Sequence, residues 1–204
     1  MDSVTHRPVC GHCLRPSSTC ICQWVRPTAH VVEVLVLQHP LEKHQAKGSA
    51  RLLHLSLPHS RIVVGEAFAT PVWPVDGKHT LLLYPDTPLD TAPDLLPPPP
   101  LPSEWLQNPS RLRLVVLDGT WRKSRKMLYS SPPLQALPRL ALRGLPPSHY
   151  RIRKAHLPDQ LSTLEATCAA LAQLEGDADR FQPLLAAFDG FVGQQAGYVS
   201  PRSG

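Results

Sequence analysis

Four cysteines lie close together near the start of the chain, with a spacing that suits a metal ion. Cys10, Cys13, Cys20 and Cys22 form the pattern C-x2-C-x6-C-x-C. Four thiolates complete the tetrahedral shell of zinc and leave no open position for a catalytic water, so such a site is structural. A reducing compartment favours this metal site over two disulfides, redox-active thiols or free thiols. The fifth cysteine, Cys168, recurs with leucines at helical spacing and is predicted to lie in the core.

A second group of residues suited to chemistry directly follows an apolar run, at Asp118, Gly119, Thr120 and Trp121. A carboxylate at the end of a buried strand can act as a general base, or hold an ammonium or hydroxyl group of a ligand. Gly119 allows close backbone approach, Thr120 places a hydroxyl at the start of a helix, and Trp121 offers a face for stacking a base or adenine. The alternative is structural, with Asp118 capping the next helix and Trp121 in the core.

Positive charge is concentrated around this turn. The 204 residues carry a formal net charge of +5, yet residues 111–154 contain eleven Lys or Arg and one acid, Asp118. That segment therefore carries +10, and the rest of the chain sums to −5. Such a block favours a polyanionic partner, most simply nucleic acid, with a solvated basic face as the alternative.

Several classes of protein lack support in the sequence. No apolar run approaches the roughly 20 residues of a membrane span, and residues 1–7 lack the apolar core of a signal peptide. We therefore expect a cytoplasmic protein without membrane association. The glycine-rich motifs for dinucleotides and triphosphates are absent, as is the H-x-E with P-C-x-x-C signature of zinc deaminases.

The apolar pattern predicts alternating strands and helices. Continuous apolar runs predict strands, and 3.6-residue periodicity predicts helices between them. Strands are expected at 31–37, 61–64, 80–84 and 113–117, with weaker candidates at 139–143 and 150–153; helices are expected at 45–57, 121–129, 162–176 and 179–195. Residues 85–109 contain nine prolines and are predicted to form a loop with polyproline character, without a helix or a central strand.

This alternation predicts an α/β fold, a mostly parallel sheet with flanking helices. We expect residues 1–29 to form a small N-terminal zinc knuckle, 30–195 the main domain and 196–204 a flexible tail. Ligands of such sheets bind beyond the carboxyl ends of the strands. Three segments compete for that place, namely 84–85, 118–121 and the turn entering the helix at Ser162.

Several motifs together resemble the DTW-domain proteins, a family named for its Asp-Thr-Trp signature. The signature region is 117–121, followed by 126–128 and 131–132. Other segments match in the same order: 10–22 with Arg15-Pro16, 39–42, 48–53, 83–85, 148–154 and 162–166. The resemblance covers residues 7 to about 195. Residues 47–51 depart from the family's polar pattern, and the proline-rich 85–109 segment looks particular to this chain.

The resemblance implies a tRNA-uridine aminocarboxypropyltransferase. Such enzymes move the 3-amino-3-carboxypropyl group of S-adenosylmethionine to N3 of a tRNA uridine and release methylthioadenosine. It also implies a SPOUT-like fold whose C-terminal chain forms a trefoil knot around the S-adenosylmethionine site. No obligate protein partner is implied, although a homodimer is compatible with this class.

The resemblance also assigns roles to residues. Asp118 is the candidate general base, with Trp121 beside it in the catalytic motif. The donor pocket is lined by Tyr84, Pro85, Leu117, Gly119, Thr120, Ser162, Thr163 and Glu165, with Arg153 or Lys154 on the donor carboxylate. A capping box would explain Glu165 equally well without a ligand. Contacts to RNA are expected from His39, Lys43, Arg51, Arg122, Lys123 and Arg125.

Two alternative functions are a SPOUT-type RNA methyltransferase and a non-catalytic RNA-binding module built on the zinc knuckle. The methyltransferase would use the same donor but release S-adenosylhomocysteine instead of methylthioadenosine. The binding module would not depend on Asp118 at all.

Overall fold

The expected strands pair side by side in one parallel sheet. A computed structural model describes residues 8–43, 45, 48–85, 97–142 and 161–197. Its strands are ordered β2-β1-β4-β3-β5, and every pairing is parallel. They are β1 (Glu33–Gln38), β2 (Ser60–Val64), β3 (His79–Leu83), β4 (Leu112–Asp118) and β5 (Arg139–Leu140). The prediction of a parallel α/β sheet with flanking helices is confirmed.

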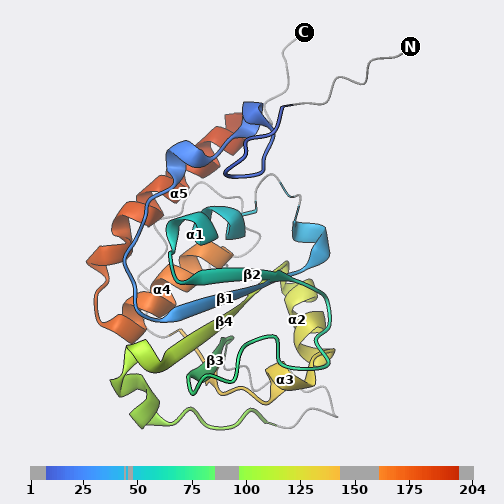
Figure 1. Cartoon of the computed structure of the whole chain (residues 1–204), viewed down its shortest axis with the longest axis vertical. Coiled ribbons are helices and arrows are strands. Elements are labelled where there is room, and N and C mark those ends of the chain that lie inside the picture. Colours follow the sequence, from blue (N-terminus) through green and yellow to red (C-terminus); the bar gives the residue numbers. More distant parts are fainter. Residues whose placement is uncertain (1–7, 44, 46–47, 86–96, 143–160, 198–204) are drawn as a thin grey trace.

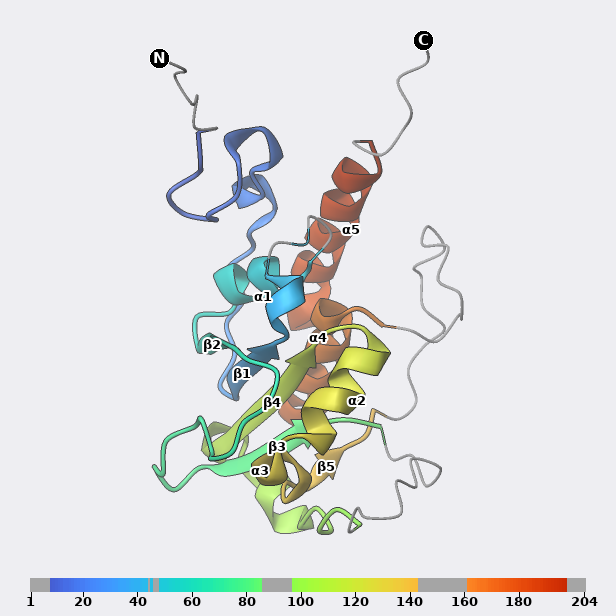
Figure 2. The same ribbon diagram turned by 90° about the vertical axis from the view of Figure 1, so that its right-hand side faces the viewer.

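Helices cover both faces of this sheet (Figures 1 and 2). They are α1 (Ala50–Ser56), α2 (Trp121–Tyr129), α3 (Pro132–Gln135), α4 (Thr163–Glu175) and α5 (Gln182–Gly197). Short 3-10 helices occur at Ser17–Thr19, Cys22–Trp24, Pro40–Glu42, Ser103–Gln107, Pro109–Arg111 and Asp179–Phe181. Within the described ranges, no helix combines the length and apolar composition needed to cross a bilayer.

Successive side chains of the central strands point to opposite faces and build two separate cores. Leu114 and Val116 of β4 pack with apolar side chains of α1, α4 and α5. Val115 and Leu117, the alternate residues, pack with α2 and α3 instead. β4 is buried along its whole length because both of its faces are covered, which explains its nearly unbroken apolar sequence.

Some boundaries differ from the sequence prediction. The helix expected at 45–57 begins only at Ala50; Gly48, a poor helix former, and the N-cap residue Ser49 precede it. The proline-rich segment was predicted to hold no helix, but the proline-free stretch Ser103–Gln107 forms a 3-10 helix. The short helix α3 was not predicted; it begins on Pro132, and proline is favoured at a first helical position.

Other differences concern the C-terminal half. The strand expected at 139–143 has two residues, Arg139–Leu140, and α5 runs to Gly197 rather than ending at 195. The start and end of α4 were predicted well, since Ser162 caps it and Gly176 ends it in a left-handed conformation at φ 69°. The weak strand expected at 150–153 lies outside the described residues, and the C-terminal knot stays a prediction.

The N-terminal cysteine segment packs on the helices rather than standing apart (Figure 1). Cys13 and Ile21 belong to the same core as α1, α4 and α5. The indole N–H of Trp24 donates to the Gln194 side chain, and the Trp24 ring lies where a Cβ on Gly190 would come within 2.2 Å of it. The position therefore requires glycine. The N-terminal segment thus shares its core with the α/β domain.

Candidate functional site

Asp118 ends β4 at the carboxyl edge of the sheet, directly beside Gln38 at the end of β1. Gln38 Nε2 donates to Asp118 Oδ2 at 2.9 Å, and Thr163 Oγ1 donates to Oδ1 at 2.6 Å. The carboxylate is therefore held by two neutral donors from two elements, β1 and α4. Its side chain does not cap the helix that follows, because the Thr120 hydroxyl accepts from the Lys123 amide instead.

The surroundings of Asp118 disfavour its charged form. The residue is 5% exposed. Burial raises its pKa, the hydrogen bonds from Thr163 and Gln38 act to lower it, and the nearby charge of Glu42 raises it again, with a net upward shift. A carboxyl of raised pKa in a partly closed site is suited to accepting a proton, which is the property of a general base.

Trp121 stacks on Tyr84 on the other side of the sheet edge. The centres of the two rings are 5.3 Å apart and their planes are inclined at 18°. The Arg139 guanidinium lies 5.1 Å from the centre of the Tyr84 ring. Tyr84 is buried, whereas Trp121 is 45% exposed. Trp121 therefore is not a core residue, and its outer face can accept another flat ring. Asp118 bonds to Thr163 of α4, and Trp121 is the first residue of α2. The two residues therefore lie on either side of the end of β4.

The first turn of α4 also lies at this edge. Ser162 Oγ accepts from the Glu165 amide at 3.2 Å, and Glu165 Oε2 accepts from the Ser162 amide at 2.7 Å. This is a complete capping box, so the Glu165 carboxylate already has a structural role. Thr163, expected in the donor pocket, gives its hydroxyl hydrogen to Asp118.

The residues expected to contact RNA differ in how available they are. His39 is buried, with Nε2 3.3 Å from Glu66 Oε1 and Nδ1 accepting from the Leu41 amide. Lys43 and Arg122 are exposed.

The other expected contacts already have partners. Lys123 Nζ is 2.6 Å from Glu42 Oε1, Arg51 donates to the His12 carbonyl at 2.8 Å, and Arg125 lies 5.6 Å from the centre of the Tyr129 ring. Of the expected donor-site residues, Leu117 is buried, Gly119 is half-buried, and Thr120 and Pro85 are exposed. Arg153 and Lys154 lie outside the described residues.

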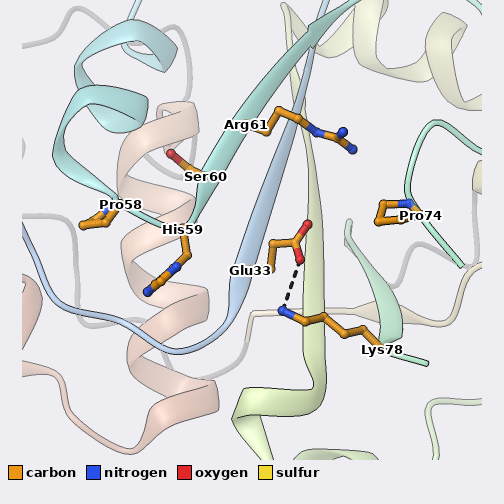
Figure 3. A pocket seen from close by; sticks show the side chains of 7 residues that line it. All are labelled: Glu33, Pro58, His59, Ser60, Arg61, Pro74 and Lys78. Carbon is orange, nitrogen blue, oxygen red and sulfur yellow. Dashed lines mark ion pairs between the residues drawn. The ribbon is translucent and has the colours of Figure 1, made fainter. Parts of the chain in front are cut away.

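The basic segment does not form one uniform surface. Arg113 is 0% exposed and is 2.9 Å from Glu33, with Asp76 as a second carboxylate partner. Its charge is therefore used inside the fold. A pocket of about 270 Å³ lies beside this network, lined by Glu33, Pro58, His59, Ser60, Arg61, Pro74 and Lys78 (Figure 3). It sits at the amino ends of β1 and β2, at the edge of the sheet opposite Asp118.

The four N-terminal cysteines come together as their spacing predicted. Their Sγ atoms all lie within 4.8 Å of one another, with Cys10 and Cys22 3.6 Å apart and Cys13 and Cys20 3.7 Å apart. These separations are too long for disulfides, whose sulfurs are about 2.05 Å apart. They match the roughly 3.8 Å edge of a tetrahedron with 2.3 Å metal–sulfur bonds.

The surroundings of the cysteine cluster make Cys10 and Cys22 chemically unequal. Backbone hydrogen bonds at Cys13 and His12 lower the pKa of Cys10 to about 6. Desolvation and the neighbouring thiols raise the pKa of Cys22 to about 12. Four thiols this close ionise together only around a cation, so the donor set fits a metal ion.

Gln38 and Glu42 were missed in the sequence. Gln38 ends β1, and Glu42 lies in the 3-10 turn that follows it. Neither stood out in the sequence as a chemical group. For Gln38 the available signal was its position: it is a polar residue that ends an otherwise apolar strand, next to a second strand that also ends in a polar residue.

Comparison with known proteins assigns this arrangement to a family. The family model described as the DTW domain matches residues 7–196. The chain belongs to the DTW-domain family. The tRNA-uridine aminocarboxypropyltransferase 2 of Drosophila melanogaster is 31% identical over 194 residues, covering 90% of this chain and 73% of the fly protein.

Two more distant relatives carry related names. The tRNA-uridine aminocarboxypropyltransferase 2 of Mus musculus is 28% identical over 86% of this chain, which spans only 59% of the mouse protein. The tRNA-uridine aminocarboxypropyltransferase A of Arabidopsis thaliana is 24% identical over 98% of this DTW-domain chain and 85% of its own length. No solved structure matches the chain.

Proposed function

We propose that this DTW-domain protein is a tRNA-uridine aminocarboxypropyltransferase that uses S-adenosylmethionine as the group donor. The observation that carries the proposal is the buried Asp118 carboxyl at the carboxyl edge of a parallel sheet, held by neutral donors and lying in the family's signature motif. The names of the relatives support the same reaction.

Asp118 acts as the general base in this reaction. Uridine N3 is a weak acid and must lose its proton as it attacks the carbon beside the donor's sulfonium. Asp118 takes that proton, the new N–C bond forms, and the C–S bond breaks with its electron pair passing to sulfur, which gives methylthioadenosine. The raised pKa of Asp118 brings the carboxyl closer to the operating pH than an exposed aspartate would be.

Trp121 and the first turn of α2 receive the RNA. The exposed face of Trp121 offers a stacking surface for the target base, supported from behind by Tyr84 and Arg139. Arg122 and Lys126 project from the same helix into solvent, where they can meet phosphates. Lys123 and Lys126 now pair with Glu42 and Glu66, so binding of RNA would exchange these carboxylates for phosphates.

Zinc in the cysteine cluster has a structural role in this proposal. Cys10, Cys13, Cys20 and Cys22 would hold it, and four thiolates leave it no open position for chemistry. Arg15 lies 5.3 Å from the centre of the Phe191 ring of α5, and it donates to the Gly48 carbonyl at 3.0 Å. Metal binding would therefore stabilise the docking of the N-terminal segment. We expect one zinc per chain by elemental analysis; a metal-free chain with two disulfides would contradict this assignment.

The test of the proposed activity is incubation of the purified chain with bulk tRNA and S-adenosylmethionine, followed by mass spectrometry of the nucleosides and of the small-molecule by-product. We expect 3-(3-amino-3-carboxypropyl)uridine together with methylthioadenosine. Methyluridine with S-adenosylhomocysteine would identify a methyltransferase instead. Binding of tRNA with neither product would support the non-catalytic module.

A further inference from the structure

We propose that Gln38 and Thr163 are positioning residues that fix the orientation and the protonation of the Asp118 carboxyl; the inference rests on the proposed function. We call this pair the Asp118 clamp. Its two members are far apart in the sequence, and they reach different oxygens of the carboxyl, one from the end of β1 and one from the start of α4.

The clamp uses each oxygen of the carboxyl once. Gln38 Nε2 donates to Oδ2 at 2.9 Å, and Thr163 Oγ1 donates to Oδ1 at 2.6 Å. Each carboxylate oxygen has two lone pairs, so each keeps one for a substrate proton. Donors on both oxygens fix the plane of the carboxyl, which is the geometric condition for a base that must meet one particular N–H.

The members of the clamp are themselves held firmly. Gln38 is 7% exposed, and its backbone carbonyl accepts from the Gly65 amide at 3.0 Å. Thr163 is the first residue of α4 behind the capping box of Ser162 and Glu165, and its carbonyl accepts from the Thr167 hydroxyl at 2.6 Å. A hydroxyl at the start of a capped helix has a defined direction.

The clamp also works against the cost of burying a charge. Burial favours the protonated carboxyl, while a donor on each oxygen favours the carboxylate. The charged groups on the surrounding elements include Glu42 on the 3-10 turn, Lys123 on α2, Glu165 on α4 and His39 beside β1. Of these, Lys123 pairs with Glu42, Glu165 closes the capping box, and His39 faces Glu66. Removal of either clamp donor should therefore make Asp118 harder to ionise.

The experiment follows Asp118 directly, without relying on activity. The full chain is labelled with ¹³C-aspartate, and the Asp118 carboxyl signal is assigned by its loss in Asp118→Asn. We expect Thr163→Val and Gln38→Met to raise the titration midpoint of that signal by about one pH unit, a tenfold change in the protonation equilibrium. Thr163→Ser keeps the hydroxyl and should restore the wild-type midpoint.

Thr167→Val is the matched control. It removes a threonine hydroxyl one turn later on the same helix, and that hydroxyl donates to the Thr163 carbonyl and not to Asp118. We expect its midpoint to equal that of the wild type. Equal midpoints in wild type, Thr163→Val and Gln38→Met, with all chains folded by circular dichroism, would overturn the clamp.

An activity arm separates the clamp from the proposed function. The pH–rate profile for aminocarboxypropyl-uridine formation is recorded for wild type, Thr163→Val and Gln38→Met. Compared with wild type, the acidic limb of both variants should shift to higher pH, by the same amount as the midpoint measured by NMR. Shifted midpoints without any product from the wild type would overturn the proposed function while supporting the clamp. Product from the wild type with unshifted midpoints would do the reverse.

Discussion

The two ends of β4 each bury an ionisable residue, and the surroundings of these two residues have opposite effects on their charge. At the amino end, Arg113 is fully buried between Glu33 and Asp76, with Lys78 3.1 Å from Glu33. Although burial acts to lower the pKa of Arg113, the hydrogen bonds that it donates to both carboxylates raise it, so its charge is stabilised. At the carboxyl end, the described residues give Asp118 two neutral donors and no cation.

This difference separates a structural charge from a chemical one. A buried charge surrounded by opposite charges stays ionised at every ordinary pH and cannot exchange protons usefully. A buried carboxyl with neutral donors has a raised pKa and takes up a proton more readily than an exposed one, a property that suits a general base. One ionisable residue of the strand therefore holds the loop at Asp76, and we propose that the other carries out chemistry.

Replacing Arg113 breaks the structural end of this comparison. Arg113→Met leaves the carboxylates of Glu33 and Asp76 without their shared cation, and we expect it to lower the free energy of unfolding by about 3 kcal/mol, toward the low end for a broken buried pair because both acids are partly exposed. Adding Glu33→Gln and Asp76→Asn should recover part of the loss. Urea denaturation measures both, and the rate per folded molecule should be unchanged. A rate loss like that of an Asp118 variant would contradict the division of roles.

Replacing Trp121 tests the aromatic side of the chemical end. Trp121→Ala removes the stacking face and should raise the KM for tRNA about tenfold, equal to about 1.4 kcal/mol. Trp121→Phe keeps a flat ring and should restore most of the affinity. Steady-state kinetics with tRNA and donor varied separately provide the measurement. A rise in the KM for S-adenosylmethionine instead would assign Trp121 to the adenine of the donor.

The smallest effect concerns stability and pH. Because the pKa of Asp118 is raised in the fold, the folded chain binds this proton more tightly than the unfolded chain does. Below the pKa of the unfolded chain, about 3.9, Asp118 is protonated in both states and burying it carries no charge penalty. As pH rises through the raised pKa of the folded chain, the wild type loses stability relative to Asp118→Asn. We expect the Asn variant to melt higher at neutral pH, by about 2–4 °C for each 1 kcal/mol.

Calorimetry across the pH range checks the sign of that difference. The advantage of the Asn variant should disappear in acid, where Asp118 is protonated in the folded and unfolded chains alike. A wild type that melts above the variant at neutral pH would show that the ionised carboxyl stabilises the fold.

Most of the order of strands and helices could be predicted because the central strands β1, β3 and β4 are apolar runs and α4 has clear boundary signals. Ser162 and Gly176 marked both ends of α4, and the cysteine spacing marked the thiol cluster. Pairings between distant residues could not be predicted in this way. The +10 segment suggested one basic face, yet only the structure separates buried Arg113 from exposed Arg122.

The partners of Asp118 show the same limit. Gln38 and Thr163 are 80 and 45 residues away from it along the chain, and no local pattern marks either as a donor to that carboxyl. Parallel pairing brings Gln38 beside Asp118, and the packing of α4 brings Thr163. Chemistry that depends on such meetings requires the fold.

The most direct test of the account compares wild type with Asp118→Asn in a single-turnover assay of aminocarboxypropyl-uridine formation. Asparagine can accept from Gln38 with its oxygen and donate to Thr163 with its nitrogen, so the fold and tRNA binding should persist. Without a base, the rate should fall by about 10²–10⁴-fold. A folded variant that binds tRNA and still forms product at the wild-type rate would contradict the assignment of Asp118 as the base.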